Sequence, residues 1–127
     1  MSHSATLGLL ALAGAIGTLC RFGLSGLVMH ITGRGFPWGT LVVNASGCLL
    51  FGLIAVPIES RLPLTPQSRL ILLTGFLGAF TTFSTFAYES AEQLHESSWL
   101  PAMGNILGQN ALGIACIFAG MALARAL

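Results

Sequence analysis

The chain has 127 residues, of which 54% are hydrophobic and only 7% are charged, whereas a soluble domain carries roughly 25% charged residues. Five arginines, four glutamates and no lysine are too few to cover a water-facing surface, and the net charge of +1 leaves no basic face for nucleic acid. The composition therefore predicts an all-α integral membrane protein that forms a single domain.

Four segments are long and apolar enough to cross a bilayer, which requires about 20 apolar residues per helix. They are predicted at residues 5–29, 38–57, 68–88 and 99–123. No positively charged residue precedes the first segment, so we interpret it as a retained helix and not as a cleaved signal. Trp38 and Trp99 begin the second and fourth spans, and tryptophan is enriched at that depth of the membrane.

Small side chains inside the spans predict close contacts between helices. Ala13 and Gly17 share one helix face, as do Gly104 and Gly108, and such spacings allow two backbones to approach. Three cysteines lie inside apolar runs without the paired spacing of a metal site: Cys20, Cys48 and Cys116. We expect these thiols to be buried as small hydrophobic groups.

The charge bias that would orient the chain in a membrane is weak. Four spans place both termini and the central connector on one side, with Arg61, Arg69 and Arg125, and leave Arg21 and Arg34 on the other. The positive-inside rule barely distinguishes these two sides. We therefore expect insertion in both orientations and antiparallel pairing of two copies. The alternative is that the small charge difference, or burial of Arg21, still selects one orientation.

Two polar residues inside the spans are functional candidates, because polar groups are costly in lipid. Arg21 lies toward the far end of the first span, where it either extends to the interface without a specific role or lines a vestibule that attracts anions. Asn44 follows Trp38 by ~9 Å of helix. Its amide either joins neighbouring helices or serves an ion path. Both alternatives stay open for each residue.

The third span combines features that disfavour a continuous helix. Gly75 and Gly78 weaken helix propensity. Four hydroxyl side chains offer hydrogen bonds that compete with the backbone: Thr81, Thr82, Ser84 and Thr85. A break here would free carbonyl oxygens, which suit a small cation such as Na⁺. Such a break is tolerated at membrane depth only where protein buries it or where it lines an aqueous cavity.

Aromatic and amide side chains continue the pattern. Four phenylalanines at helical spacing predict one face of the third span: Phe76, Phe80, Phe83 and Phe86. This stripe is either a packing face or a path on which the positive edges of the rings hold an anion weakly. In the fourth span, Asn105 and Gln109 share a face that would extend a polar track. The chain has no phosphate loop, metal cluster or paired nucleophile and base, so we predict that it is not an enzyme.

Three motifs in these spans resemble one family. The segments GAIGTLCRF (14–22), WGTLVVNASG (38–47) and GFLGAFTTFSTF (75–86) are similar to those of the Fluc/CrcB fluoride channels of bacteria. The resemblance covers all four spans in order, and only Cys20 and Cys48 depart from the usual residues. It implies an antiparallel, dual-topology homodimer in the bacterial plasma (inner) membrane, with two fluoride pores that are each lined by both subunits.

The resemblance also implies roles for individual residues. Phe83 and Phe86 would be the pore phenylalanines, with Asn44 at the end of the pore. Ser84 and Thr85 would supply hydroxyls along the track. The partners would be the fluoride ion, membrane lipid and a second copy of the chain, without nucleic acid.

The implied break would hold a central structural Na⁺ through main-chain oxygens of Gly78 and Thr81 from both subunits. The implied function is passive export of F⁻, which relieves fluoride toxicity. The main alternative is a small dual-topology multidrug transporter. That class needs a carboxylate within the membrane to exchange protons, whereas all four glutamates are expected at or beyond the span ends. A non-conducting scaffold would have no use for hydroxyls and Asn44 beside a glycine-rich break.

Overall fold

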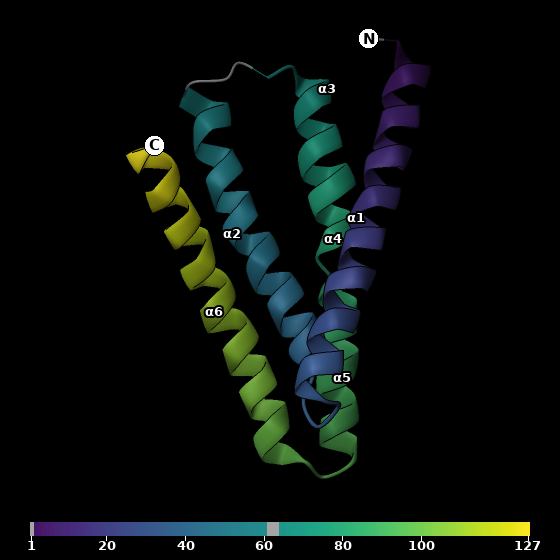
Figure 1. The fold of residues 1–127 in the computed structure, drawn as a ribbon, viewed down its shortest axis with the longest axis vertical. Coiled ribbons are helices and arrows are strands. Elements are labelled where there is room, and N and C mark those ends of the chain that lie inside the picture. Colours follow the sequence, from purple (N-terminus) through teal and green to yellow (C-terminus); the bar gives the residue numbers. More distant parts are fainter. Residues whose placement is uncertain (1, 61–63) are drawn as a thin grey trace.

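The computed structural model describes residues 2–60 and 64–127, and these ranges consist of helices joined by short turns. The elements in chain order are α1 (His3–Thr32), α2 (Trp38–Ser60), α3 (Pro66–Arg69), the π-helical segment η1 (Leu70–Leu77), α4 (Gly78–Phe80), α5 (Phe83–His95) and α6 (Trp99–Ala126). The segments from α3 to α5 follow one another along a single rod (Figure 1), and the described residues contain four helical rods of membrane length. Arg61, one of the three arginines expected at the end with both termini, lies outside the described residues.

The expectation of an all-helical chain with four long apolar helices is confirmed. The helices long and apolar enough to cross a membrane are His3–Thr32, Trp38–Ile58, Pro66–His95 and Trp99–Ala126. The third extends beyond the predicted limit of residue 88, because α5 continues through a polar segment to His95. Alanine, glutamate and glutamine in that segment are good helix formers, so loss of apolar character does not end the helix.

Capping residues fix the ends of the rods. The Ser2 hydroxyl accepts a hydrogen bond from the Ala5 amide at 3.3 Å and starts α1. Gly33 ends α1 with φ at 80°, a left-handed conformation that favours glycine. Thr65 accepts from the Ser68 amide at 3.2 Å, and Pro66 occupies the first turn of α3, where a missing N–H is tolerated.

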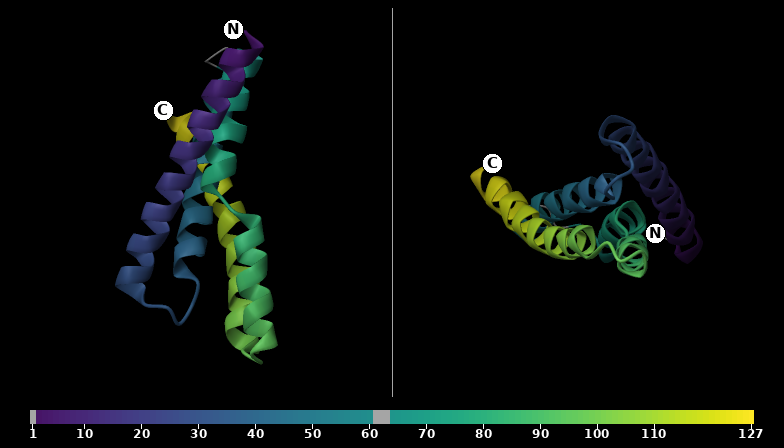
Figure 2. Two further views of the ribbon diagram at one scale, coloured as in Figure 1. Left: turned by 90° about the vertical axis from the view of Figure 1, so that its right-hand side faces the viewer. Right: turned by 90° about the horizontal axis from the view of Figure 1, so that it is seen from below.

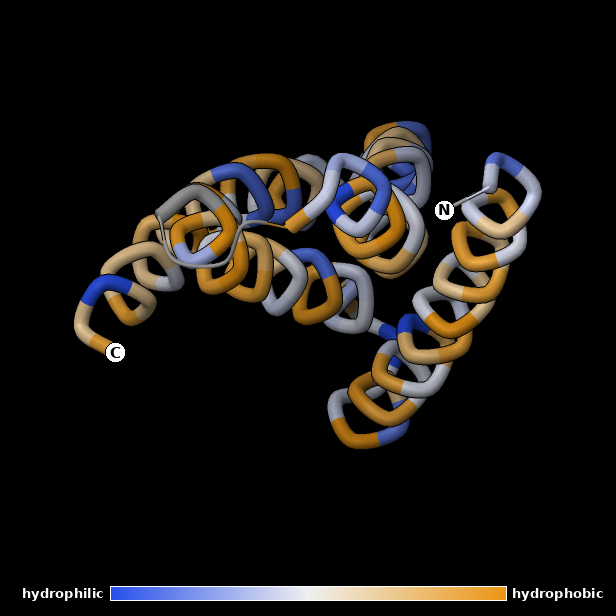
Figure 3. Tube along the Cα trace, turned by 90° about the horizontal axis from the view of Figure 1, so that it is seen from above, coloured by the Kyte–Doolittle hydropathy of each residue, from blue (hydrophilic) through white to orange (hydrophobic). Residues whose placement is uncertain are grey.

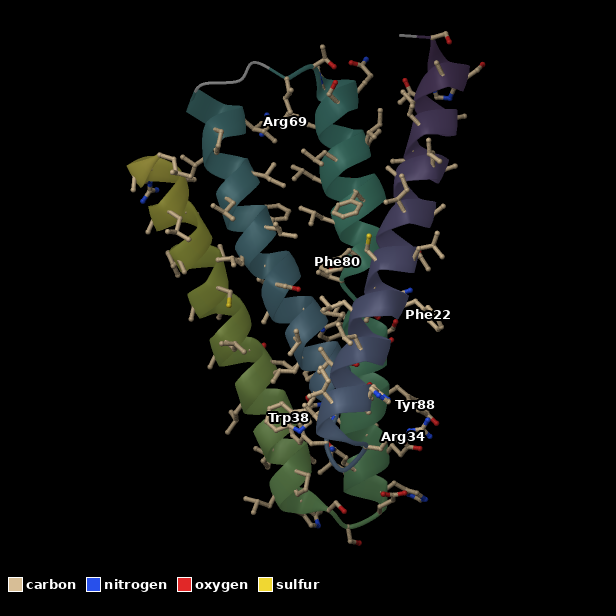
Figure 4. The ribbon with its side chains drawn as sticks, in the orientation of Figure 1. Phe22, Arg34, Trp38, Arg69, Phe80 and Tyr88 are labelled. Carbon is tan, nitrogen blue, oxygen red and sulfur yellow. The ribbon has the colours of Figure 1, made fainter. Side chains whose placement is uncertain are left out.

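Many large apolar side chains face outward. Leu19, Phe22 and Leu100 are exposed by 69%, 78% and 85%, whereas the buried core includes Leu77 and Phe80. In Figure 4, Phe22 points away from the bundle. Figure 3 shows hydrophobic residues along the length of the rods, with hydrophilic residues more frequent near their ends. Such a surface requires an apolar cover, which a bilayer or a second copy would provide.

Helices α2 and α6 run side by side in the same direction (Figure 1), and glycines set their distance. A Cβ atom on Gly52 would overlap the Ile117 carbonyl, and one on Gly120 would overlap the Leu49 carbonyl. Each backbone therefore lies against the other at a glycine. This close approach fixes the register that places polar side chains of α2 and α6 opposite each other.

Of the two small-residue pairs predicted from the sequence, only the first makes a close contact within the described chain. A Cβ on Gly17 would overlap the Phe76 carbonyl, and one on Gly75 would lie 3.1 Å from the Ala13 Cβ. This contact joins α1 to η1 and α4. Within the protomer, a Cβ on Gly104 or Gly108 would have its nearest neighbours at 3.8 and 4.0 Å, which is ordinary packing. The expectation of a close contact at these two glycines therefore stays a prediction.

The Gly17→Ala substitution is expected to lower the melting temperature of the detergent-solubilised protein. The added methyl group meets a backbone carbonyl and not a flexible side chain, and overpacking of this kind destabilises by about 1–3 kcal/mol. Gly8→Ala is the matched control, because nothing lies within 4 Å of a Cβ at that position. Thermal unfolding followed by circular dichroism measures both variants. Equal melting temperatures would contradict the close contact.

The rods diverge toward the end that carries both termini. At the opposite end, α5 and α6 lie close together, and the turn at residues 33–37 brings α1 to α2 (Figures 1 and 2). Figure 4 places Arg69 and Arg34 at opposite ends of the molecule. The divergence leaves α2 and α6 apart from the first half of the third rod (Figure 1).

Candidate functional site

The third rod is interrupted at two consecutive threonines. Thr81 and Thr82 are both extended, with φ and ψ of −86° and 157° and of −149° and 113°. Their hydroxyls take over local hydrogen bonds: Thr81 Oγ1 donates to the Leu77 carbonyl at 3.0 Å, and Thr82 Oγ1 accepts from the Thr85 amide at 3.2 Å. The hydroxyl-rich sequence therefore ends one helix and caps the next, as side chains that compete with the helical ladder do.

Asn44 of α2 holds this interruption from the side. Its Oδ1 accepts from the Thr82 amide at 2.8 Å, and its Nδ2 donates to the Thr82 carbonyl at 3.1 Å. The same Nδ2 donates to Gln109 Oε1 of α6 at 2.9 Å. A primary amide carries two N–H protons, so both donors of Asn44 are engaged. The side chain thus joins α2, α6 and the extended segment.

Two carbonyl groups lose their helical donors at the interruption. In a continuous helix the Thr82 amide would donate to Gly78 and the Thr85 amide would donate to Thr81. Here those two amides donate to the side chains of Asn44 and Thr82 instead. The carbonyl oxygens of Gly78 and Thr81 are therefore free of these partners. They are hard oxygen ligands of the kind that alkali cations prefer.

The described residues contain no group of three or more His, Cys, Asp or Glu side chains that would hold a metal ion. Gly78 is exposed and Thr81 is half-buried.

A cavity of about 310 Å³ lies beside the interruption, between α2, α6 and the third rod. Phe83 and Phe86 line it together with Asn44, Thr81 and Gln109. The two rings meet edge to face, with centroids 5.5 Å apart and planes at 61°. Phe86 is buried, whereas Phe83 is 78% exposed. The walls of the cavity thus combine aromatic rings with side-chain amides.

The predicted continuous stripe of four phenylalanines is wrong. Phe76 and Phe80 stack at 6.0 Å on the other side of the interruption, and neither lines the cavity with Phe83 and Phe86. Extended residues between two helices reset the helical period, so the spacing of four, three and three residues does not describe one face. The aromatic residues form two separate pairs.

Arg21 lies in a second cavity of about 370 Å³, on the other side of the Asn44–Thr82 contact. Hydroxyl side chains surround the half-buried guanidinium: Thr18, Ser25, Thr40, Thr82 and Thr85. Thr85 accepts from the Thr82 hydroxyl at 2.9 Å. Ser84 is exposed, lies 3.4 Å from the Thr82 hydroxyl, and lines neither cavity. Apart from Ser84, the candidate residues thus divide between two cavities that both reach the interruption.

Glu89 directly follows residue 88, where the sequence predicts the end of the third span. It belongs to the third membrane-length helix, is half-buried, and accepts a hydrogen bond from the Thr40 hydroxyl at 2.6 Å. Its other carboxylate oxygen is buried without a hydrogen-bond partner among the described residues.

The sequence did not predict the contact between Asn44 and Gln109. It placed Asn105 and Gln109 on one face of the fourth span. In the structure each of the two also has a further hydrogen-bond partner: Asn44 for Gln109 and Ser90 for Asn105. Gln109 Nε2 donates to Asn105 Oδ1 at 3.3 Å, and Asn105 Nδ2 donates to Ser90 Oγ at 2.9 Å. Asn105 is completely buried. The only available signal was the buried amide itself, which requires a partner but does not identify one.

Comparison with known proteins gives a consistent result. A family model described as CrcB-like protein, Camphor Resistance (CrcB), matches residues 8–121. A protein of Nitrosococcus oceani named fluoride-specific ion channel FluC is 54% identical over 91% of this chain and 93% of its own length. Proteins of the same name from Solidesulfovibrio magneticus and Chloroflexus aurantiacus are 54% and 42% identical, over 94% and 91% of this chain and 95% and 92% of their own lengths.

Proposed function

The chain belongs to the CrcB family, and from this premise we propose that it is a fluoride-selective ion channel. The observation that carries the proposal is 54% identity, over more than nine-tenths of both chains, to proteins named fluoride-specific ion channels. The four membrane-length helices agree with a multi-pass membrane protein. An ion channel performs no covalent chemistry, so under this proposal the protein is not an enzyme.

The direction of transport follows from the chemistry of a weak acid. Hydrogen fluoride is neutral and crosses the bacterial plasma (inner) membrane from acidic surroundings. It ionises inside the cell and is trapped as F⁻. A passive anion channel lets the membrane potential, which is negative inside, drive the ion out. Export therefore needs no nucleotide and relieves fluoride toxicity.

The pore is assigned to the cavity at the interruption. The edges of the Phe83 and Phe86 rings carry partial positive charge and offer an anion a weak site, and a weak site also releases the ion. Asn44 lines this cavity and would stand at the end of the pore. Across the Asn44–Thr82 contact, Arg21 and Thr85 line the second cavity, which would serve as a vestibule that attracts anions. Ser84 is exposed toward the outside of the protomer and would contribute its hydroxyl beside a second copy.

An antiparallel, dual-topology homodimer is the assembly we propose, with two pores that are each lined by both subunits. The 78% exposure of Phe83 supports it, because a pore residue must be shielded from lipid by another wall. The exposed Gly78 supports it as well. Among the described arginines, neither end of the molecule is strongly favoured, which agrees with insertion in both orientations.

A structural Na⁺ at the centre of the dimer would be held by the carbonyl oxygens of Gly78 and Thr81 from both copies. These two carbonyls lack their helical donors, which is the property that such a site requires. The cation would neutralise the carbonyl dipoles that converge from the two subunits.

Replacing Na⁺ by K⁺ throughout purification is expected to reduce fluoride efflux at least about tenfold, because four converging carbonyls would lose a cation of fitting size. Efflux from liposomes prepared in the two salts measures the effect. Return of activity after Na⁺ is added back would exclude irreversible unfolding. Equal efflux in both salts would contradict the site.

The proposed function is tested by efflux from liposomes that contain the protein purified in sodium salts, loaded with sodium fluoride or sodium chloride and followed with ion-selective electrodes. We expect rapid F⁻ release and little Cl⁻ release. The assay uses no proton gradient, because passive efflux through a channel does not need one. Proton-driven transport of a cationic drug, without F⁻ release, would support the multidrug-type transporter. No movement of either ion in folded protein would support a scaffold.

A further inference from the structure

Gln109 is linked to Asn44 through a directed chain of hydrogen bonds. From one end, the Ser90 hydroxyl donates to the Phe86 carbonyl at 2.9 Å, so its oxygen is left to accept from Asn105 Nδ2. Asn105 must then present Oδ1 to Gln109 Nε2. This leaves Gln109 Oε1 facing Asn44. Ser90 is 5% exposed and Asn105 is 0% exposed, so the starting end of the chain is fixed in the protein interior.

The other end of the chain requires the same direction. The Thr82 amide can only donate, so Asn44 must present Oδ1 to it. Asn44 Nδ2 then donates its two protons to the Thr82 carbonyl and to Gln109 Oε1. Both ends therefore agree, and a rotation of any one amide would place two donors or two acceptors face to face.

The two protons of Asn44 differ in how readily they are released. The bond to the Thr82 carbonyl is one of two hydrogen bonds that Asn44 makes to the backbone of Thr82, the other being to its amide. The bond to Gln109 is a single contact to a side chain that lines the cavity. An anion that reaches Asn44 from the cavity therefore gains an N–H donor only by displacing Gln109 Oε1.

We propose that Gln109 is a positioning residue that competes internally with the permeating anion for the Nδ2 proton of Asn44. The inference rests on the proposed fluoride channel and adds a specific role for this side chain. The competition keeps Asn44 from holding the anion tightly, which conduction requires. The polarity of the chain, fixed at Ser90 and at Thr82, keeps the competing oxygen directed at Asn44.

The test is the Gln109→Met variant, which keeps the length of the side chain and removes the competing oxygen. Current across planar bilayers is measured as a function of fluoride concentration. In this variant the anion no longer has to displace the hydrogen bond between Asn44 and Gln109. The half-saturating fluoride concentration is therefore expected to fall roughly 2- to 10-fold, which is the worth of one neutral hydrogen bond. The maximal current is expected to fall as well, because the anion leaves its site more slowly. Gln67→Met is the control, since Gln67 is exposed in α3 outside both cavities.

The sign of the shift decides between competition and other roles. A rise in the half-saturating concentration would overturn the inference, because it would mean that Gln109 itself binds the anion. An unchanged value would overturn it as well, because Gln109 would then only support the fold. Gln109→Ser, which is too short to reach Asn44 in the same way, is expected to shift the value downward too and is used if the methionine variant does not fold. If the unmodified protein carries no fluoride current, the proposed function fails before this comparison is reached.

Discussion

Fluoride efflux from reconstituted liposomes is expected to fall at least about tenfold when Phe83 or Phe86 is replaced by isoleucine, which corresponds to about 1.4 kcal/mol in the barrier. Isoleucine keeps the apolar character of each wall but has no positive ring edge to stabilise an anion. The two rings also orient each other through their edge-to-face contact at 5.5 Å. Each single substitution therefore removes one ring edge and releases the other ring.

Phe118→Ile is the control for this prediction, because Phe118 is 67% exposed on α6 and does not line either cavity. Its efflux should match that of the unmodified protein. All variants are compared after size-exclusion chromatography, so that loss of folding is separated from loss of conduction. If both phenylalanine variants keep efflux within about twofold of the unmodified protein, the two rings serve only in packing, and the assignment of the pore to this cavity is contradicted.

The sequence predicted the four rods well, because the membrane imposes a length of about 20 apolar residues on each span. The sequence also indicated that the third rod continues as a helix beyond its apolar part, and α5 extends to His95. It did not predict that Glu89 of α5 accepts a hydrogen bond from Thr40 of α2. Contacts of that kind depend on how two helices are placed side by side, and a single sequence does not contain this placement.

The site was predicted in part. Thr81, Thr82 and the nearby glycines indicated a weak point in the third span, and the backbone is extended at the two threonines. The contact of Asn44 with Gln109 was not predictable, because it depends on the register of α2 against α6. That register is set where Gly52 and Gly120 allow the two backbones to touch, and the chain contains 16 glycines that offer many alternatives.

The aromatic stripe shows why periodicity failed in the same region. A helical period predicts a common face only while the helix is continuous. The sequence indicated both the stripe and the weak point, but these two expectations exclude each other. The interruption lies between Phe80 and Phe83. The structure therefore has the weak point that the sequence indicated and lacks the continuous stripe.

Asn44→Asp is expected to have a larger effect than either phenylalanine variant. A carboxylate about 5 Å from a permeating anion opposes it by about 3 kcal/mol at an effective dielectric constant of about 20, which is on the order of a hundredfold in rate. The substitution also removes the Nδ2 donor that binds the Thr82 carbonyl and Gln109. Fluoride current across planar bilayers measures the loss. Current close to that of the unmodified protein would mean that the ion path does not pass Asn44.

Asn44→Leu separates the charge from the hydrogen bonds, since leucine is neutral and of similar volume. It removes all three hydrogen bonds of the side chain, so the free energy of unfolding is expected to fall by roughly 2–4 kcal/mol. The fluoride current is expected to fall on the order of tenfold, because the Thr82 backbone is no longer held.

Lowering the pH should restore part of the current of the aspartate variant, because protonation removes its charge, and should leave the current of the leucine variant unchanged. If the leucine variant keeps the full current, the hydrogen bonds from Asn44 to the Thr82 backbone do not shape the pore. The loss of current in the aspartate variant is then purely electrostatic. If both variants lose current to the same extent and neither responds to pH, Asn44 acts only by holding the interruption in place.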